Sequence, residues 1–315
     1  MSRFATLGGF IAVVLVFRWL LPDTFLTAAN LLNVSRQISM LAVVALTMTV
    51  VMAMGDFDLS VGSIASLAGV VAAVCFQSGW PIPAAIGAAL ATGIACGLVN
   101  GVLVSLIGVL PFVATLGTLT LYSGLAFHLA DGKTIFGRDI PDAFGAFARG
   151  GIPIEALGIT LPALTLVAAA VALLCWLMLE RFRTGRHLYV IGDNTAAATL
   201  AGIPVRRLRL LAFGVTGLGA ATAGLMLASR VASANPIQGS GLMLDAIAAV
   251  FLGMTLRDEA TPHVLPTLTG VALLGVIDNA LTQLSVDSYV REMLVGAIVI
   301  AAVSWAALRS RRTGH

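Results

Sequence analysis

Two carboxylates interrupt a nearly continuous apolar stretch, in the segment MAMGDFDLSVGSIASLAG that runs from Met52 to Gly69. Carboxylates at membrane depth are costly unless they are paired, solvated or protonated. Asp58, followed by Ser60, is placed to stabilise the start of a helix, where the helix dipole favours a negative charge. Asp56 has no such local role, so we expect it to contact a partner helix, the cytoplasmic mouth or a conducting path.

A second group of polar residues lies in two apolar stretches that resemble each other. GLVNGVLVSL, from Gly97, and GVIDNALTQL, from Gly275, start about 178 positions apart and carry Asn100 in the first, Asp278 and Asn279 in the second. An offset of five spans reverses the direction of the chain, which predicts two inverted halves, as in many transporters. Both an interior polar contact and a substrate contact remain open for Asn100 and Asn279.

A glycine stripe accompanies the first of these stretches. Gly93, Gly97 and Gly101 recur every four residues, which removes the side chains from one face of a helix. Such a face lets another helix backbone approach closely, so the stripe predicts helix packing.

No motif for catalysis accompanies these polar residues. The four histidines are dispersed, the three cysteines lie in apolar stretches, and the phosphate loop G-x-x-x-x-G-K-[ST], the G-x-S-x-G elbow and the H-E-x-x-H pair are all missing from the sequence. We therefore expect a non-enzymatic chain that binds no cofactor or metal itself.

The elements that must position these residues are membrane helices. The 315 residues are 59% hydrophobic and 10% charged, with a mean hydropathy of +1.00, whereas about a quarter of the residues in soluble domains are charged. The predicted fold class is an all-α, polytopic helical membrane protein, with one transmembrane domain over residues 1–315. Since the basic residues cluster at the ends of spans, they indicate membrane topology rather than a nucleic-acid partner.

About ten spans fit this length. The first, after Arg3, is expected to be an uncleaved span rather than a removed signal. The predicted spans are Phe4 to Leu21, Gln37 to Met54, Ser60 to Phe76, Ile82 to Leu106, Leu110 to Ala130, Ile159 to Leu179, Leu210 to Ser229, Leu242 to Leu256, Val264 to Leu284 and Tyr289 to Leu308. An even count with arginine-rich inner segments predicts cytoplasmic N- and C-termini. Glycine and proline punctuate an outer loop at about 131–158, in which Asp142 to Ala148 suits a short helix.

The longest polar and basic interruption, Gly185 to Arg209, lies within the inner segment at about 181–209. Asp193 or Asn194 is placed to cap a short helix over Thr195 to Ala201, and Gly202 suits its left-handed end. One interpretation is an ordinary loop whose arginines meet anionic lipid. The other is a docking helix that offers its small residues to a soluble partner, since so short a helix must be held by packing.

Three separated motifs carry a resemblance to a known family. GDFDLSVGS, GRHLYVIGDNTAAATLAGIPV and ASRVASANPIQGSGLMLDAIAAVFLG occur here in the order found in the membrane subunit of the ribose, arabinose, xylose and galactose type of bacterial ABC importer, and the resemblance covers nearly the whole chain. It implies a ten-span permease of the inner membrane that pairs with itself in the lipid bilayer. It also implies a periplasmic sugar-binding protein that delivers a monosaccharide or a related small polar solute, and a cytoplasmic ATPase that holds ATP and Mg.

The resemblance assigns roles to residues at both places. It makes the basic segment a coupling helix that faces the ATPase, with the candidates Gly185, Arg186, Gly192, Asp193, Asn194, Ala197 and Gly202. It places Gly239 and Asp245 at the central pathway, where the full set of candidates is Asp56, Asp58, Ser60, Asn100, Gly239, Asp245 and Asn279.

The chain departs from the family pattern after Gly253. Many relatives have a glycine-rich stretch there, whereas this chain reads GMTLRDEATPHV, with Arg257, Asp258, Glu259 and Pro262. The identity of the sugar and the local geometry therefore do not transfer.

The alternative function is a proton- or sodium-coupled secondary transporter, in which Asp56, Asp58 or Asp278 titrates. The basic segment, Gly185 to Arg209, distinguishes the ABC importer permease from the secondary transporter, because a self-sufficient carrier needs no docking helix.

Overall fold

Helices dominate the computed structural model, which describes residues 2–155, 158–256, 261–290, 292–294, 296–298 and 300. Six helices in this part of the chain are long and apolar enough to cross a membrane. They are α2 (Ala28–Met52), α4 (Ile82–Val102) with its π-helical continuation Leu103–Ile107, α5 (Pro111–Leu129), α7 (Ala163–Trp176) with its π-helical end Leu177–Arg181, α10 (Val205–Val231) and α12 (Val264–Gln283). The shorter apolar helices are α1 (Ser2–Leu20), α3 (Val61–Gln77) and α11 (Leu242–Met254).

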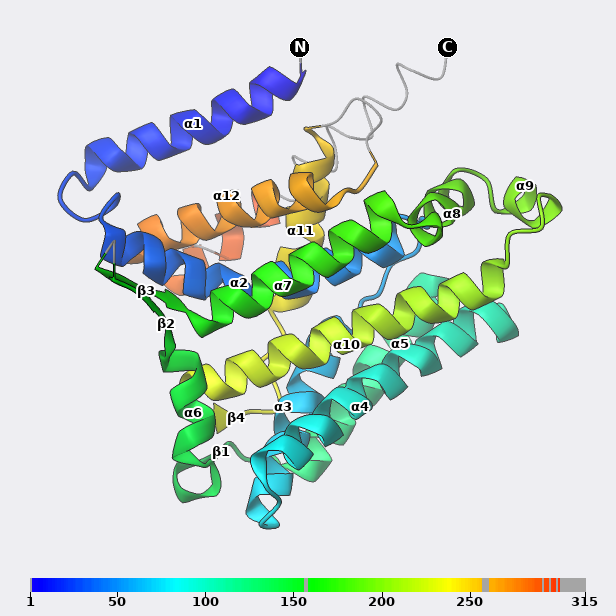
Figure 1. Cartoon of the computed structure of the whole chain (residues 1–315), viewed down its shortest axis with the longest axis horizontal. Helices are drawn as coiled ribbons and strands as arrows, with labels where there is room; N and C mark the ends of the chain where they lie inside the picture. Colours follow the sequence, from blue (N-terminus) through cyan, green and yellow to red (C-terminus); the bar gives the residue numbers. More distant parts are fainter. Residues whose placement is uncertain are drawn as a thin grey trace.

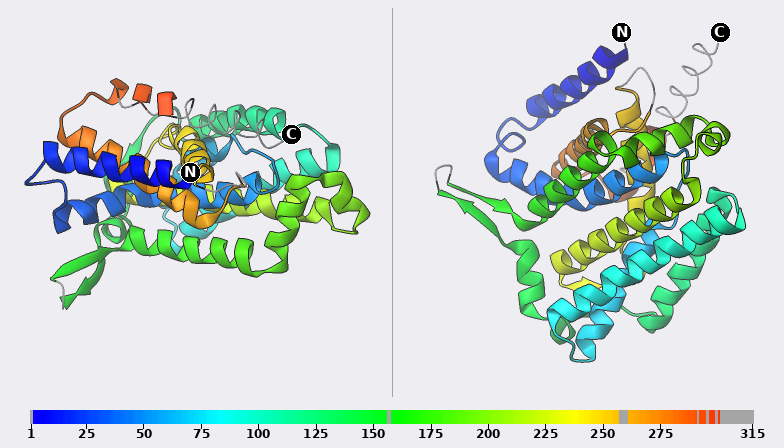
Figure 2. Two further views of the ribbon diagram at one scale, coloured as in Figure 1. Left: turned by 90° about the horizontal axis from the view of Figure 1, so that it is seen from above. Right: turned by 45° about the vertical axis from the view of Figure 1, so that its right-hand side comes forward.

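The small elements gather at the two opposite ends of the long helices (Figure 1). One end carries α6 (Asp142–Arg149), the turn η2 (Gly137–Asp139) and four short strands: β1 (Ile135–Phe136), β2 (Gly151–Ile154), β3 (Ile159–Pro162) and β4 (Ser233–Ala234). Strand β1 pairs antiparallel with β4 (Ile135 opposite Ala234), and β2 with β3 (Gly151 opposite Pro162). The β2–β3 hairpin projects from the helices (Figure 2). The other end carries α8 (Arg183–Asp193) and α9 (Thr195–Leu200).

The helices coincide with nine of the predicted spans, but some boundaries were wrong. Helix α2 begins at Ala28 rather than Gln37, because the Thr27 hydroxyl caps it by accepting from the Asn30 backbone N–H at 3.2 Å. Residues 159–162 form strand β3 rather than the start of a span, so the fold is mostly helical with two small sheets, not purely helical. The predicted tenth span lies partly outside the described residues, and 289–290, 292–294, 296–298 and 300 within it are helical.

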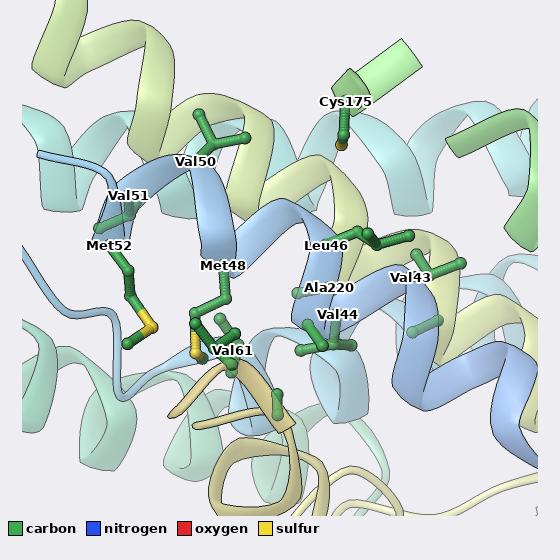
Figure 3. Close-up of a cluster of buried hydrophobic side chains, with 14 of the residues drawn as sticks. Val43, Val44, Leu46, Met48, Val50, Val51, Met52, Val61, Cys175 and Ala220 are labelled. Atoms are coloured by element: carbon green, nitrogen blue, oxygen red, sulfur yellow. The ribbon is translucent and has the colours of Figure 1, made fainter. Parts of the chain in front are cut away.

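The centre of the core is the second half of α2, from Met40 to Met52, which is buried throughout (Figure 3). Helix α2 packs against α11 and α12, which follow it distantly in the sequence, and α10 packs against α3 and α4. Each of these two long helices therefore completes a group of helices formed by another part of the chain.

The predicted glycine stripe forms the seam between α4 and α10. A Cβ atom added to Gly93 would lie 2.5 Å from the Gly217 carbonyl oxygen, and one added to Gly97 would lie 2.2 Å from that of Phe213. At Gly101 the nearest atom would be the Leu210 Cα, at 3.0 Å. The packing prediction is confirmed, since no side chain fits between these backbones.

Two irregular connections lead into the shorter helices and meet inside the fold. Residues 53–60 precede α3, and residues 232–241, which include β4, precede α11. A Cβ atom on Gly62 would lie 2.6 Å from the Gly239 carbonyl oxygen, and the Ser66 hydroxyl accepts from the Gly239 backbone N–H at 2.9 Å. Gly239 therefore brings the second connection into direct backbone contact with the first turns of α3.

Candidate functional site

A fully buried polar network surrounds Asp58. Its Oδ1 accepts from the Ser60 backbone N–H at 2.9 Å and from the Ser60 hydroxyl at 2.6 Å. The Asn100 amide on α4 donates to the Ser60 hydroxyl at 2.8 Å and lies 3.4 Å from both Asp58 oxygens, while Thr118 on α5 donates to the Asn100 carbonyl at 2.7 Å. Asp58 thus binds the backbone just before α3 and also joins that connection to α4 and α5. The candidates Asp58, Ser60 and Asn100 form one site.

Asp56 lies apart from that network and has a cation partner. Its carboxylate accepts from Arg209 on α10 at 2.8 Å (Nε) and 3.3 Å (Nη2), and its side chain is only 6% exposed. The expectation that Asp56 touches a partner helix is confirmed. This ion pair ties the α2–α3 connection to the start of α10.

The basic segment folds as two helices, where the sequence predicted one. Helix α9 is the predicted one, and Asn194, not Asp193, caps it by accepting from the Ala197 backbone N–H at 2.9 Å. Gly202 has the expected left-handed conformation, with φ of +78°. Helix α8, which carries Gly185, Arg186 and Gly192, was missed.

Helix α8 is held against the end of α2 and against the residues that lead into α12. A Cβ atom on Gly192 would lie 2.4 Å from the Ala53 carbonyl oxygen, so α8 sits directly on the end of α2. On the other side, the Tyr189 hydroxyl donates to the Pro262 carbonyl at 2.9 Å and lies 3.1 Å from Nδ1 of His263, and the two rings stack with centroids 4.8 Å apart. Glu180 lies 3.8 Å from the same His263 nitrogen.

Several small or apolar residues of α9 remain uncovered. Ala196, Ala197 and Ala201 are exposed, and Leu200 is 90% exposed. Among the large hydrophobic side chains of the described residues, Leu200 has the highest exposed fraction. We call Ala196, Ala197, Leu200 and Ala201 the α9 face.

The remaining pathway candidates lie in other places. Asp245, in the first turn of α11, lines a cavity of about 170 Å³ together with Gln37 and Asp278, which form a hydrogen bond. Asn279 accepts from Asn30 on α2 at 3.0 Å. The seven candidates therefore do not converge on one site.

Sequence reasoning missed several partners. Arg209 binds Asp56, Thr118 binds Asn100, and His263 contacts Tyr189 of α8. None of these residues carries a local sequence signal for that role. In the segment that departs from the family pattern, Arg257, Asp258 and Glu259 lie outside the described residues, and Pro262 supplies the carbonyl that binds Tyr189. No group of three or more metal-ligand side chains occurs in the part of the chain that the structure describes.

Comparison with known proteins gives a consistent result. The chain matches the family described as "Branched-chain amino acid transport system / permease component" over residues 30–303. It is 38% identical over 297 residues to the ribose import permease protein RbsC of Bacillus subtilis (strain 168), covering 94% of this chain and 90% of that protein. It is 31% identical over 293 residues to the D-allose transport system permease protein AlsC of Escherichia coli (strain K12), covering 93% of this chain and 87% of that protein. No solved structure matches it significantly.

The apolar helices, with polar groups paired between them, define a multi-pass protein of the inner membrane. The chain belongs to the permease family of the sugar ABC importers. Members of this family are non-catalytic membrane components of their transporters, so this chain is a permease subunit rather than an enzyme.

Proposed function

We propose that this permease imports a monosaccharide, delivered by a periplasmic binding protein, with energy from ATP hydrolysed on a separate cytoplasmic subunit. ATP and Mg bind on that subunit, and this chain binds no cofactor. The relatives named for ribose and allose support a sugar as the cargo. The single observation that carries the proposal is that α8 packs on the membrane helices while the α9 face remains exposed.

That segment has the properties of a coupling element. The α9 face is open to a soluble partner, while α8 packs on the end of α2 through Gly192 and on the start of α12 through Tyr189. A push on the α9 face therefore reaches two transmembrane helices, α2 and α12, at once. An ordinary loop that only met anionic lipid would need neither an exposed apolar face nor two packed contacts.

Ten spans arranged as two inverted halves are also part of the proposal. The element boundaries recur at about the offset of the sequence repeat, with α2, α3 and α4 in one half and α10, α11 and α12 in the other. The exchange of α2 and α10 between the two groups supports the same arrangement. With the α8–α9 end facing the cytoplasm, both termini lie in the cytoplasm.

A second copy of the permease completes the pathway in this proposal. Helix α5 packs mainly on α3 and leaves an apolar surface uncovered, with Leu116, Leu121 and Leu125 exposed. A Cβ atom added to Gly117 or Gly124 on that helix would meet nothing within 4 Å among the described residues, which leaves room for another helix to approach. The outer end, with α6 and the β2–β3 hairpin, is the surface proposed for the binding protein.

Reconstitution tests the proposal against the secondary-transporter alternative. The permease, its ATPase and its binding protein would be placed in liposomes, and uptake of radiolabelled D-ribose measured with and without internal ATP. We expect uptake only with ATP and both partners. Uptake by the permease alone, driven by a proton or sodium gradient, would overturn the proposal.

A further inference from the structure

A small cavity lies where the two irregular connections meet. It has a volume of about 120 Å³ and lies between α3, α5 and the start of α11. Its lining includes four hydroxyl groups, Ser63, Ser66, Ser123 and Ser240. The other lining residues are apolar, among them Leu119 and Met243, and no charged side chain lines it.

The four hydroxyls differ in the hydrogen bonds that they can still form. Ser63 donates to the Ser60 carbonyl at 2.8 Å and keeps its lone pairs, whereas Ser66 accepts from the Gly239 N–H and keeps its proton. The side-chain hydroxyls of Ser123 and Ser240 have no hydrogen-bond partner among the described residues, and both side chains are at least partly exposed. The cavity can therefore both donate and accept hydrogen bonds at several points.

The chemistry of this lining favours one class of ligand, a sugar. A sugar ring presents hydroxyls at its edges and C–H groups on its faces, which match serines set among apolar side chains. A zwitterionic amino acid would bring two charges into a lining without a counter-charge, at a desolvation cost. The nearby carboxylate of Asp58 already accepts bonds from Ser60 and Asn100, so it is engaged elsewhere.

The size and position indicate a transient contact. An apolar cavity of about 150 Å³ admits benzene, so about 120 Å³ accommodates part of a sugar ring rather than a whole one. Irregular backbone inside a membrane protein is tolerated where it lines a pathway, and transporters commonly contact substrate at such broken elements. Partial enclosure lets the substrate leave again.

We infer that the cavity lined by Ser63, Ser66, Ser123 and Ser240 is a contact site for a neutral polyhydroxylated substrate, a monosaccharide, during its passage. This inference rests on the proposed function. It goes further by assigning the cargo's class to a set of side chains, and by excluding charged amino acids, which the description of the wider family names.

Thiol protection tests the site without depending on transport. Ser240→Cys would be introduced into a Cys75→Ser background, since Cys75 is the partly exposed native cysteine whereas Cys96 and Cys175 are buried. Alkylation by N-ethylmaleimide would be timed on the purified permease with D-ribose or L-leucine at equal concentrations. We expect D-ribose to slow the reaction and L-leucine to leave it unchanged. Equal protection by both, or by neither, would overturn the inference.

Transport measurements provide the second arm. In the reconstituted complex, Ser123→Ala with Ser240→Ala should lower ribose uptake per ATP hydrolysed by about two- to tenfold for each hydrogen bond to the sugar that is lost. Ser105→Ala is the matched control, because Ser105 bonds the Gly101 carbonyl of its own helix and does not line the cavity. Wild-type uptake by the double variant would contradict the site, whereas ribose uptake by the wild-type protein that needs no ATP and is driven by a proton or sodium gradient would contradict the proposed function instead.

Discussion

Gly192→Ala is the most informative single change, because it disturbs the seating of α8 and little else. The added Cβ atom would lie 2.4 Å from the Ala53 carbonyl oxygen, where ordinary contacts begin near 3.4 Å, so α8 must shift by about 3.4 − 2.4 = 1.0 Å at this point. The carbonyl belongs to the backbone at the end of α2 and cannot rotate away as a flexible side chain would.

The magnitude follows from two opposing terms. Overpacking at such a contact costs about 1–3 kcal/mol. Replacing glycine by alanine inside a helix returns about 1 kcal/mol through helix propensity. The net destabilisation of the seated position is therefore up to about 2 kcal/mol, which corresponds to a factor of up to about 30 in its population.

The assay is ATP-driven sugar uptake in liposomes, with ATPase activity measured in the same preparation. We expect Gly192→Ala to retain the bound ATPase, since the α9 face is unchanged, and to transport less sugar per ATP. Gly87→Ala is the matched control, because Gly87 lies on an exposed face of α4 and an added Cβ there meets nothing within 4 Å. Normal uptake per ATP by Gly192→Ala would refute the reasoning.

Three further changes test the contacts around the site. Asn100→Ala should lower the free energy of unfolding by about 1–3 kcal/mol, since it leaves buried polar groups without their hydrogen-bond partner. An unchanged denaturation curve in detergent would contradict this. Asp56→Asn should destabilise the protein by about 1–3 kcal/mol, between the values for exposed and buried pairs. Exchanging the charges of Asp56 and Arg209 should recover part of that stability, and no recovery would argue against the pair. Tyr189→Phe should lower the free energy of unfolding by about 0.5–1.5 kcal/mol, because it removes the hydroxyl but keeps the ring stack. A double-mutant cycle of Tyr189→Phe and His263→Ala should give a non-zero coupling energy for uptake.

The apolar helices could be predicted from the sequence because their signal is local. Long hydrophobic runs gave most of the spans, and the glycine period gave the seam between α4 and α10. The cap of α9 was also predictable, since Asn194 acts on a backbone group three residues away. Each of these features depends on neighbouring residues alone.

Features that depend on distant partners were missed. Residues 28–36 of α2 were not predicted as part of a span, yet Asn30 pairs with Asn279 and Ser35 with Thr165, which makes a polar helix face acceptable. Helix α8 was missed because its arginines resemble a loop, although Leu188 and Ile191 give it a buried face. The partner of Asp56 lies on a helix far along the chain, where no sequence pattern points to it.

Ala197→Glu gives the most direct test that an ATPase acts through the α8–α9 segment. Ala197 is exposed on α9, so a glutamate there disturbs no internal contact but places a charge and a long side chain on the proposed docking face. Ala146→Glu, at an exposed alanine of α6 at the opposite end, is the matched control. The measurement is the amount of ATPase that co-purifies with each variant, together with ATP-driven sugar uptake. We expect Ala197→Glu to reach the membrane normally but to lose the ATPase and uptake, while Ala146→Glu keeps the ATPase. An Ala197→Glu permease with full ATPase binding and full transport would contradict the account.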